Sequence, residues 1–165
     1  MQHSIEKVTR SRLRQRAADE RDFPAAESSG YLVRDAHRAF QRLLGKRIAE
    51  HGITRGQWYF LRVLWSEDGL SQRELSARVG MMEPTTVIAL RSMEKASLIR
   101  RVRDTDDKRK TLVWLTAKAK RMRGPMLALA RGITDEGEAG ISRDELALTR
   151  RVLAHMTQNL DRIKR

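Results

Sequence analysis

Apolar residues recur at helical spacing along most of the chain, and glycines divide this pattern into separate helices. A first stripe, with apolar positions mostly three or four residues apart, predicts a helix over about residues 28–51 that ends at Gly52. A second stripe predicts another helix over about residues 54–66, followed by a break at Gly69. The apolar residues of that second helix are Trp58, Leu61 and Trp65.

Two short helices joined by a tight turn follow this region. Ser71 and Glu74 have the spacing of a capping box, in which the hydroxyl and the carboxylate each accept a backbone N–H at the start of a helix. Gly80 ends that helix, and Pro84 stands where the first turn of the next one tolerates proline. This order predicts a helix-turn-helix.

Two strand-like segments come directly after the second short helix. Residues 98–103 and 110–115 are rich in β-branched and other apolar residues, and the polar loop 104–109 separates them. A hairpin in this place is typical of a winged helix. We therefore predict a mainly α fold with a small β-hairpin wing, with the winged helix-turn-helix over about 54–116 of a single domain, 28–165.

The C-terminal third of the domain is predicted to be two long helices, over about residues 117–163. Ser142 and Glu145 form a second capping box at the start of the last helix. The apolar residues of this helix alternate spacings of three and four, as in a heptad seam. The seam can pack into the core of its own chain or against a second copy, and the large helical share outside the winged unit favours a homodimer. Its members are Leu146, Leu153, Met156, Leu160 and Ile163.

The charge of the chain indicates a polyanionic partner. Lys and Arg number 34 against 21 Asp and Glu, which gives +13 over 165 residues. Residues 100–123 alone hold ten Lys or Arg and three Asp, a net charge of +7. Because this charge is concentrated on the hairpin and not along an amphipathic helix, it favours double-stranded DNA over a membrane surface.

Several classes of chemistry have no candidate residues. The chain contains no cysteine, and its four histidines lack metal-ligand spacing. No nucleophile with a matching base and no glycine-rich phosphate loop is present. We therefore expect no enzyme, metal site or cofactor, and the lack of a signal peptide or a long apolar run indicates a cytoplasmic protein.

The first 27 residues have little apolar periodicity and are predicted to form a basic arm. Four alternating arginines run from Arg10 to Arg16, and Pro24 lies near the end of the segment. The arm can contact DNA or a partner subunit, although a solvated tail is the favoured interpretation.

The helix after the turn is the predicted DNA-reading helix. At 100° per residue, Val87, Leu90 and Met93 share one face and should pack inward, which leaves Ile88 on the exposed face. An exposed isoleucine is explained by contact with thymine methyl groups, and the alternative is a surface helix that tolerates it. The predicted DNA contacts of this helix are Pro84, Thr85, Thr86, Ile88, Ala89, Ser92 and Lys95.

The loop of the hairpin is the second predicted contact with DNA. Arg109 lies on a thin loop, from which a guanidinium can enter the minor groove. Asp107 is expected to bond loop amides or to orient Arg101 or Arg103. The further predicted phosphate contacts are Arg100, Arg101, Arg103, Lys108 and Lys110.

Residues 70–116 resemble the MarR family of dimeric winged-helix regulators. The resemblance rests above all on Leu98-Ile99-Arg100-Arg101 and on the run Asp107-Lys108-Arg109-Lys110-Thr111-Leu112-Val113-Trp114-Leu115-Thr116. It implies that Asp107 braces the wing, that Arg109 enters the minor groove and that residues 84–92 contact bases. The chain departs from the family at Ser97, where a glycine is usual.

Regulators of this family commonly bind small, often aromatic and acidic effectors between the dimer helices and the winged domain. Imidazole, guanidinium and indole groups that meet in one cleft suit an aromatic carboxylate or its thioester. In the alternative interpretation His37 is an ordinary core residue and Arg62 only packs on tryptophan. The predicted ligand-binding residues are His37, Phe40, Trp58, Arg62 and Trp65.

The sequence thus predicts a homodimeric repressor that binds a pseudo-palindromic operator and is released by a small ligand. The rival prediction is a basic architectural protein that coats DNA without choosing sequences. The large net charge fits both functions equally. Ile88 and the neighbouring threonines favour the sequence-specific regulator.

Overall fold

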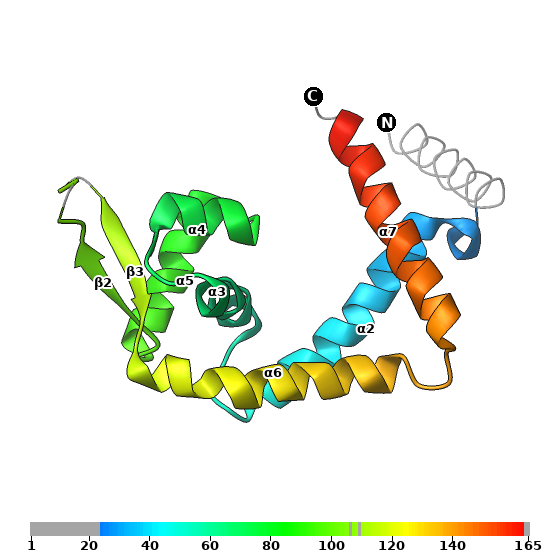
Figure 1. The fold of residues 1–165 in the computed structure, drawn as a ribbon, viewed down its shortest axis with the longest axis horizontal. Helices are drawn as coiled ribbons and strands as arrows, with labels where there is room; N and C mark the ends of the chain where they lie inside the picture. Colours follow the sequence, from blue (N-terminus) through cyan, green and yellow to red (C-terminus); the bar gives the residue numbers. More distant parts are fainter. Residues whose placement is uncertain (1–23, 106, 109, 164–165) are drawn as a thin grey trace, which may run out of the picture. The chain divides into compact units, whose positions relative to one another are not determined.

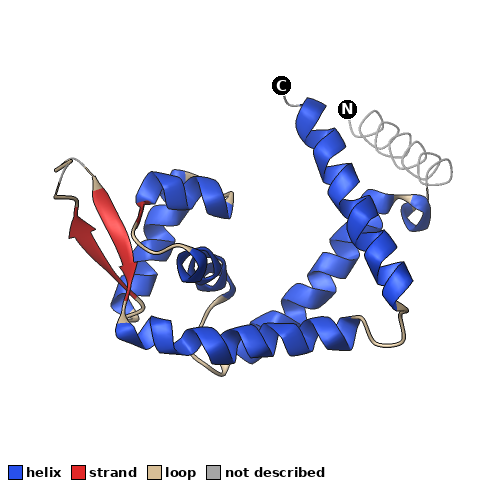
Figure 2. Ribbon diagram, viewed as in Figure 1, coloured by secondary structure: helices blue, strands red, loops and turns tan. Residues whose placement is uncertain are grey.

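A computed structural model describes residues 24–105, 107–108 and 110–163, which form a mainly helical fold with one small antiparallel sheet (Figures 1 and 2). The chain divides into two compact units, residues 1–42 and 43–165, and each is treated by itself. The short 3-10 helix Ala25–Glu27 and most of α2 (Ser29–Ala49) belong to the first unit. The elements that follow α2 are α3 (Arg55–Ser66), β1 (Leu70–Ser71), α4 (Gln72–Val79), α5 (Glu83–Lys95), β2 (Ile99–Arg103), β3 (Thr111–Leu115), α6 (Ala117–Gly137) and α7 (Arg143–Ile163).

Two helices of the winged unit begin at capping boxes. The predicted box at α4 is confirmed: Ser71 Oγ accepts from the amide of Glu74 at 3.3 Å, and the Glu74 carboxylate accepts from the Ser71 amide at 2.9 Å. Hydrogen bonds from the Ser71 hydroxyl and amide lower the pKa of Glu74 below its ordinary value. A second box, which the sequence analysis missed, joins Thr54 and Gln57 at α3. Short-range hydrogen bonds therefore set the starts of α3 and α4, whereas Met82, the N-cap of α5, makes no side-chain capping bond.

The predicted wing hairpin is confirmed, and a third strand extends it. β2 pairs with β3, and the two-residue strand β1 pairs with the other edge of β3, which gives the order β1-β3-β2. Gly69 precedes β1 with a φ of +78°, and a Cβ built there would lie 2.5 Å from Trp114 Cη2. Only glycine permits both this backbone conformation and this close approach of the Trp114 ring.

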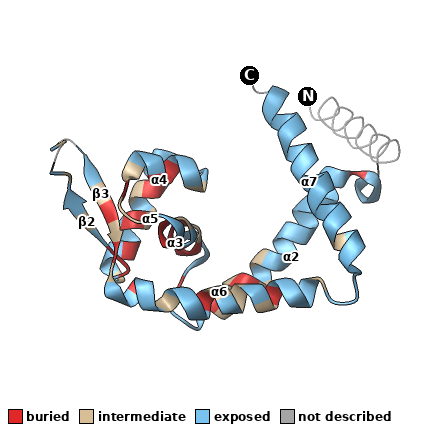
Figure 3. Cartoon of the chain, viewed as in Figure 1, coloured by how far each residue is buried: buried red, intermediate tan, exposed pale blue. Residues whose placement is uncertain are grey.

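The core of the winged unit lies where α3, α4, α5 and the sheet meet (Figure 3). Leu90 and Met93 of α5 are both 0% exposed, which confirms the inward face predicted for this helix. Val87 on the same face is only half-buried. The side chains buried with them from the other elements include Phe60, Leu61, Leu75, Leu98, Ile99, Val113 and Leu115.

α6 is attached to the winged unit, whereas α7 buries none of its residues. The predicted cap Thr116 accepts from the Ala119 amide at 3.2 Å, and the Trp65 indole donates to the Ala119 carbonyl at 2.9 Å. α7 is pale blue along nearly all of its length in Figure 3, and Leu160 and Ile163 are 62% and 81% exposed. Among the described residues the seam is therefore not part of the buried core.

The end of α5 is closed by a Schellman motif with serine in the place that favours glycine. The amide of Leu98 donates to the Met93 carbonyl and that of Ser97 donates to the Glu94 carbonyl, each at 2.9 Å. Ser97 has a φ of +56°, in the left-handed region. A Cβ in this region costs about 1–2 kcal/mol, so the cap forms but carries strain.

Replacing Ser97 with glycine is expected to raise the free energy of unfolding by about 0.5–1 kcal/mol, because the relief of Cβ strain exceeds the added entropy of the unfolded chain. Urea denaturation measures the change. Ser97→Ala is the control, since it retains the Cβ and should give no such gain. Equal stability of the glycine and alanine variants would contradict the assignment of strain to this position.

Candidate nucleic-acid interface

The outward face of α5 is an exposed strip that combines apolar and basic side chains. Ile88 is 69% exposed, which makes it one of the most exposed large apolar side chains among the described residues. Arg91 is also exposed on this face, although it was not among the predicted contacts. It follows Ile88 by three residues, so the spacing of the helix was enough to predict it. The predicted contact residues that are exposed on α5 are Pro84, Thr85, Ile88, Ser92 and Lys95.

Two predicted contacts of α5 do not lie cleanly on that strip. Thr86 is 0% exposed, and its hydroxyl has no hydrogen-bond partner among the described residues. Thr86 precedes Leu90 by four residues, so helical phase turns its side chain toward the core, and its prediction as a DNA contact is wrong. Ala89 is half-buried and packs against the core, so little of its methyl group is available for contact.

The hairpin loop is held in shape by bonds between its own groups. The amide of Asp104 donates to the Lys110 carbonyl at 3.0 Å, and the Lys110 amide donates to the Asp107 carbonyl at 2.8 Å. Arg103 Nε donates to the Lys108 carbonyl at 2.7 Å, and the Asp107 amide donates to Asp104 Oδ1 at 3.2 Å. The loop is thus braced by both arginine and aspartate side chains. Arg109 lies outside the described residues, so its insertion into the minor groove stays a prediction.

Basic side chains of the wing differ in their exposure and in whether they form ion pairs, which determines how well they can bind a phosphate. Arg103, Lys108 and Lys110 are exposed. Arg101 is half-buried and forms an ion pair with Glu94 of α5, with 3.4 Å between Nε and the carboxylate oxygen but without hydrogen-bond alignment. Arg101 therefore connects the wing to α5, and its carboxylate partner reduces the charge that it offers to DNA.

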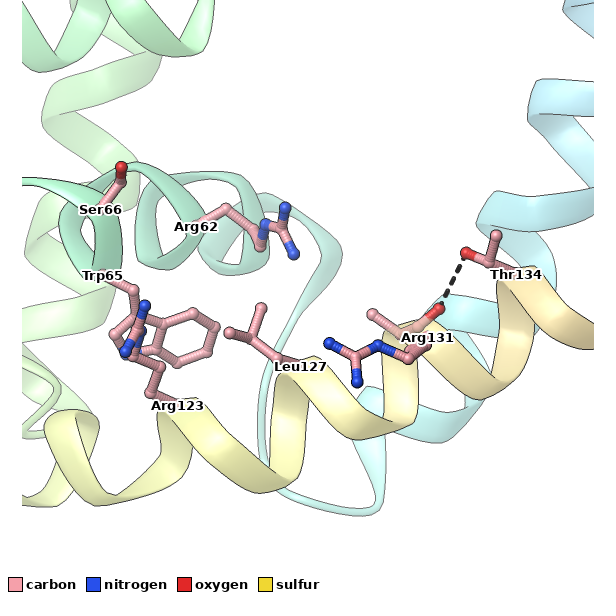
Figure 4. Close-up of a pocket in the computed structure, with 8 residues that line it drawn as sticks. Arg62, Trp65, Ser66, Arg123, Leu127, Arg131 and Thr134 are labelled. Carbon is pink, nitrogen blue, oxygen red and sulfur yellow. Dashed lines mark hydrogen bonds between the residues drawn. The ribbon is translucent and has the colours of Figure 1, made fainter. Parts of the chain in front are cut away.

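A separate open cavity of about 500 Å³ lies between α3 and α6 (Figure 4). Arg62 comes from α3, Arg123 and Arg131 come from α6, and Leu127 lies between them with the Trp65 indole nearby. None of the residues that line it is acidic. The complete lining is Arg62, Trp65, Ser66, Arg123, Leu127, Ala130, Arg131 and Thr134.

The structure brings together three of the five predicted ligand residues. The rings of Trp58 and Trp65 meet edge to face at 5.9 Å, and the Arg62 guanidinium lies 5.7 Å from the centre of the Trp58 ring. Trp58 is buried and does not line the cavity, whereas Arg62 and Trp65 do. His37 and Phe40 are exposed on α2 in the other unit, which contradicts the alternative in which His37 is a core residue.

The α6 side of the cavity was missed by sequence reasoning. Residues 123, 127 and 131 are spaced by four, and residues 130 and 134 repeat that spacing, so one helix face carries all five. This spacing was a usable signal, but only contact with α3 shows that the face lines a cavity.

The described part of the chain offers neither a metal centre nor a membrane span. No group of three or more His, Cys, Asp or Glu side chains among the described residues is arranged to hold a metal ion. No described helix combines the length and the apolar composition that crossing a bilayer needs.

The chain is similar in sequence to known transcriptional regulators. A family model described as "MarR family" matches residues 53–111. The HTH-type transcriptional regulator TtmR of Methylorubrum extorquens is 33% identical over 130 residues, which cover 79% of this chain and 66% of TtmR, just under two thirds. The homoprotocatechuate degradative operon repressor of Escherichia coli is 29% identical over 84 residues, which cover 51% of this chain and 55% of the repressor.

Solved structures share the fold over most of the chain. A MarR transcriptional regulator from Methanosarcina mazei Go1 superposes with a TM-score of 0.71 at 28% identity, covering 80% of this chain and 96% of that one. The MepR–DNA complex of S. aureus gives a TM-score of 0.74 at 22% identity and covers 80% and 98%. The winged-helix architecture predicted from the sequence is therefore confirmed.

Replacement by valine should stabilise the protein at Thr86 but have little effect at the adjacent Thr85. Thr86→Val is expected to stabilise the protein by about 1 kcal/mol, because it removes a buried hydroxyl that has no partner in the described structure. Thr85→Val, at an exposed position, should change stability by less than about 0.5 kcal/mol. Thermal or urea denaturation of both variants measures the difference. A loss of stability in Thr86→Val would show that its hydroxyl has a partner.

Proposed function

This chain belongs to the MarR family through its winged-helix domain, and from that premise we propose that it is a DNA-binding transcriptional regulator. The observation that carries the proposal is the outward face of α5, where an isoleucine that is 69% exposed lies beside exposed cationic side chains. Exposed apolar and basic groups on one helix match a DNA major groove, which offers thymine methyl groups at its floor and phosphates at its rim.

The wing supplies a second contact with DNA in this proposal. Lys108 and Lys110 are exposed on a loop that is braced by its own hydrogen bonds, so their charges are held in a narrow region of space. Lysines in this arrangement bind phosphates and fix the position of α5 on the duplex without selecting a sequence. Arg109, between them in sequence, keeps its proposed role in the minor groove.

The protein is proposed to act as a homodimer that uses α7. The apolar seam of α7 is unburied within one chain: Leu153 is 40% exposed and Leu160 is 62% exposed. A second copy of the chain is the occupant that a heptad seam suits, since each seam offers the same apolar face to its partner. Such a dimer binds two half-sites about one helical turn, or roughly 10 base pairs, apart.

The direction of regulation is proposed from the relatives. A relative named as an operon repressor supports repression in preference to activation. A protein that binds chromosomal DNA acts where that DNA is, so the cytoplasm remains the proposed location.

The cavity between α3 and α6 is proposed to bind the effector. Three guanidinium groups around an apolar floor of Trp65 and Leu127 favour an anionic ligand with a flat apolar body. An aromatic carboxylate or its coenzyme A thioester has this chemistry. Neither His37 nor Phe40 lines this cavity, so their role in ligand binding stays a separate prediction.

The second candidate function is a basic architectural protein that coats DNA without selecting sequences. The net charge of +13 supports it equally well. Ile88 does not support the architectural function. An exposed isoleucine adds nothing to phosphate binding, whereas contact with a base edge explains why it lies on this surface.

Binding to a genomic fragment library at about 0.15 M salt, followed by footprinting, separates the two functions. The regulator should retain few fragments and protect one inverted repeat over two adjacent helical turns. Ile88→Ala should lower the ratio of specific to non-specific affinity by about tenfold, because it removes a contact with base edges. Uniform retention of fragments, or an unchanged ratio in Ile88→Ala, would favour the architectural protein.

Lys108→Ala serves as the matched comparison for this experiment. It should weaken specific and non-specific binding alike and flatten the dependence of affinity on salt, since a phosphate contact releases a counterion. Arg121→Ala, which removes an exposed charge from α6, should leave the specificity ratio unchanged.

Calorimetry with a panel of aromatic carboxylates, their neutral amides and their coenzyme A thioesters tests the effector site. Arg62→Ala and Arg131→Ala should each weaken binding of the anionic members by about tenfold or more, because a charge-assisted hydrogen bond is lost. Arg121→Ala is the control for lost charge on α6. Equal binding by parent, Arg62→Ala and Arg131→Ala would remove the cavity as the site.

A further inference from the structure

A buried glutamine of α3 is hydrogen-bonded to a serine on the outward face of α5. Gln57 is 5% exposed, and its Nε2 donates to Ser92 Oγ at 3.0 Å across 35 positions of sequence. Ser92 is exposed, and it follows Ile88 by four residues, so the two share the proposed DNA-reading face. The bond therefore links the interior of the winged unit to the surface that is proposed to meet DNA.

The orientation of the Gln57 side-chain amide is fixed by its second bond. Oε1 accepts from the Thr54 backbone amide at 3.0 Å, as part of the capping box that starts α3. A backbone N–H can only donate, so the oxygen must face Thr54 and the NH₂ group must face Ser92. Gln57 is consequently a donor to Ser92 and cannot accept from it.

This arrangement decides what the Ser92 hydroxyl can do. Its oxygen already accepts from Gln57, so its single hydrogen is left to point elsewhere. Across the part of the chain that the structure describes, this hydroxyl donates to no protein group, and the side chain is exposed. The Ser92 hydroxyl is thus prepared as a hydrogen-bond donor toward solvent.

We propose that Gln57 is a positioning residue that makes Ser92 a hydrogen-bond donor to DNA, so that Ser92 selects an acceptor atom on its partner. This inference rests on the proposed function, in which α5 contacts DNA. The acceptor is a phosphate oxygen or a base-edge acceptor such as guanine O6 or N7. A serine hydroxyl has one hydrogen and two lone pairs; the bond from Gln57 occupies one lone pair, so the hydrogen is the group directed toward the partner.

Gln57→Glu reverses the polarity of this bond at nearly constant size. At pH 8 the ionised carboxylate can still accept from the Thr54 amide, but it can only accept from Ser92. The serine hydrogen then turns inward, and the donor toward DNA is lost. The expected result is a fall in affinity for the protein's own protected site of about tenfold, equal to the fall that Ser92→Ala produces.

The double variant separates positioning from other effects of the new charge. In a Ser92→Ala background, Gln57→Glu should cause no further loss, because there is no hydroxyl left to orient. General repulsion between the introduced carboxylate and DNA, or a loosened α5, would instead lower affinity equally in both backgrounds and overturn the proposal. Parental affinity in Ser92→Ala would overturn it as well.

Two further measurements keep the test decisive. Circular dichroism checks that each variant folds. If Gln57→Glu does not fold, Gln57→Met serves in its place, since it removes the donor at similar length. Gln57→Met should lower the affinity for DNA only when Ser92 is present. Binding to non-specific DNA identifies the acceptor. If the acceptor is a phosphate, the substitution lowers the affinity for specific and non-specific DNA alike; if it is a base, the substitution lowers only the affinity for the specific site. A parent protein that selects no site in the fragment library would instead refute the proposed function, which is a separate result.

Discussion

The helical phase of α5 is the constraint on which the proposed interface depends. Leu90 and Met93 are completely buried, and burial of each such side chain stabilises the fold by about 1.5–3 kcal/mol. A rotation of the helix by one residue, 100°, would expose them, so the burial of one face determines which residues stand on the other. Ile88 is held outward for this reason, although its own transfer from water would be favourable.

The wing is positioned by a contact that ties it to the segment before the helix-turn-helix. Trp114 of β3 lies against Gly69, where a Cβ would be 2.5 Å from the indole ring. Asp68, the preceding residue, accepts from the Leu115 amide at 2.8 Å and from the Gly69 amide at 3.1 Å. A side chain at position 69 would force β3 away, so one small residue sets the place of the hairpin beside α5.

Local features of this fold could be predicted from sequence because their causes are local. The Ser71 capping box joins residues three positions apart, the inward face of α5 follows from spacing within one helix, and the hairpin joins two neighbouring strands through one loop. The strand β1 has only two residues, and its pairing with Val113 and Leu112 leaves no periodic signal. The burial of Thr86 and the α6 wall of the cavity arise from packing between distant segments, which spacing alone does not reveal.

The cavity and the proposed DNA-reading helix share the same two supports. α3 lines the cavity with Arg62 and holds α5 through Gln57, while α6 lines it with Arg131 and caps the end of α5. The bonds at that end run from Thr116 Oγ1 to the Ser97 carbonyl at 2.8 Å and from Lys118 Nζ to the Ala96 carbonyl at 3.0 Å. A ligand that prefers one spacing of α3 and α6 can therefore shift the position of α5. The free energy of this shift is limited to the ligand's difference in binding free energy between the two arrangements. By linkage, if the ligand lowers the affinity for DNA by some factor, bound DNA lowers the affinity for the ligand by the same factor.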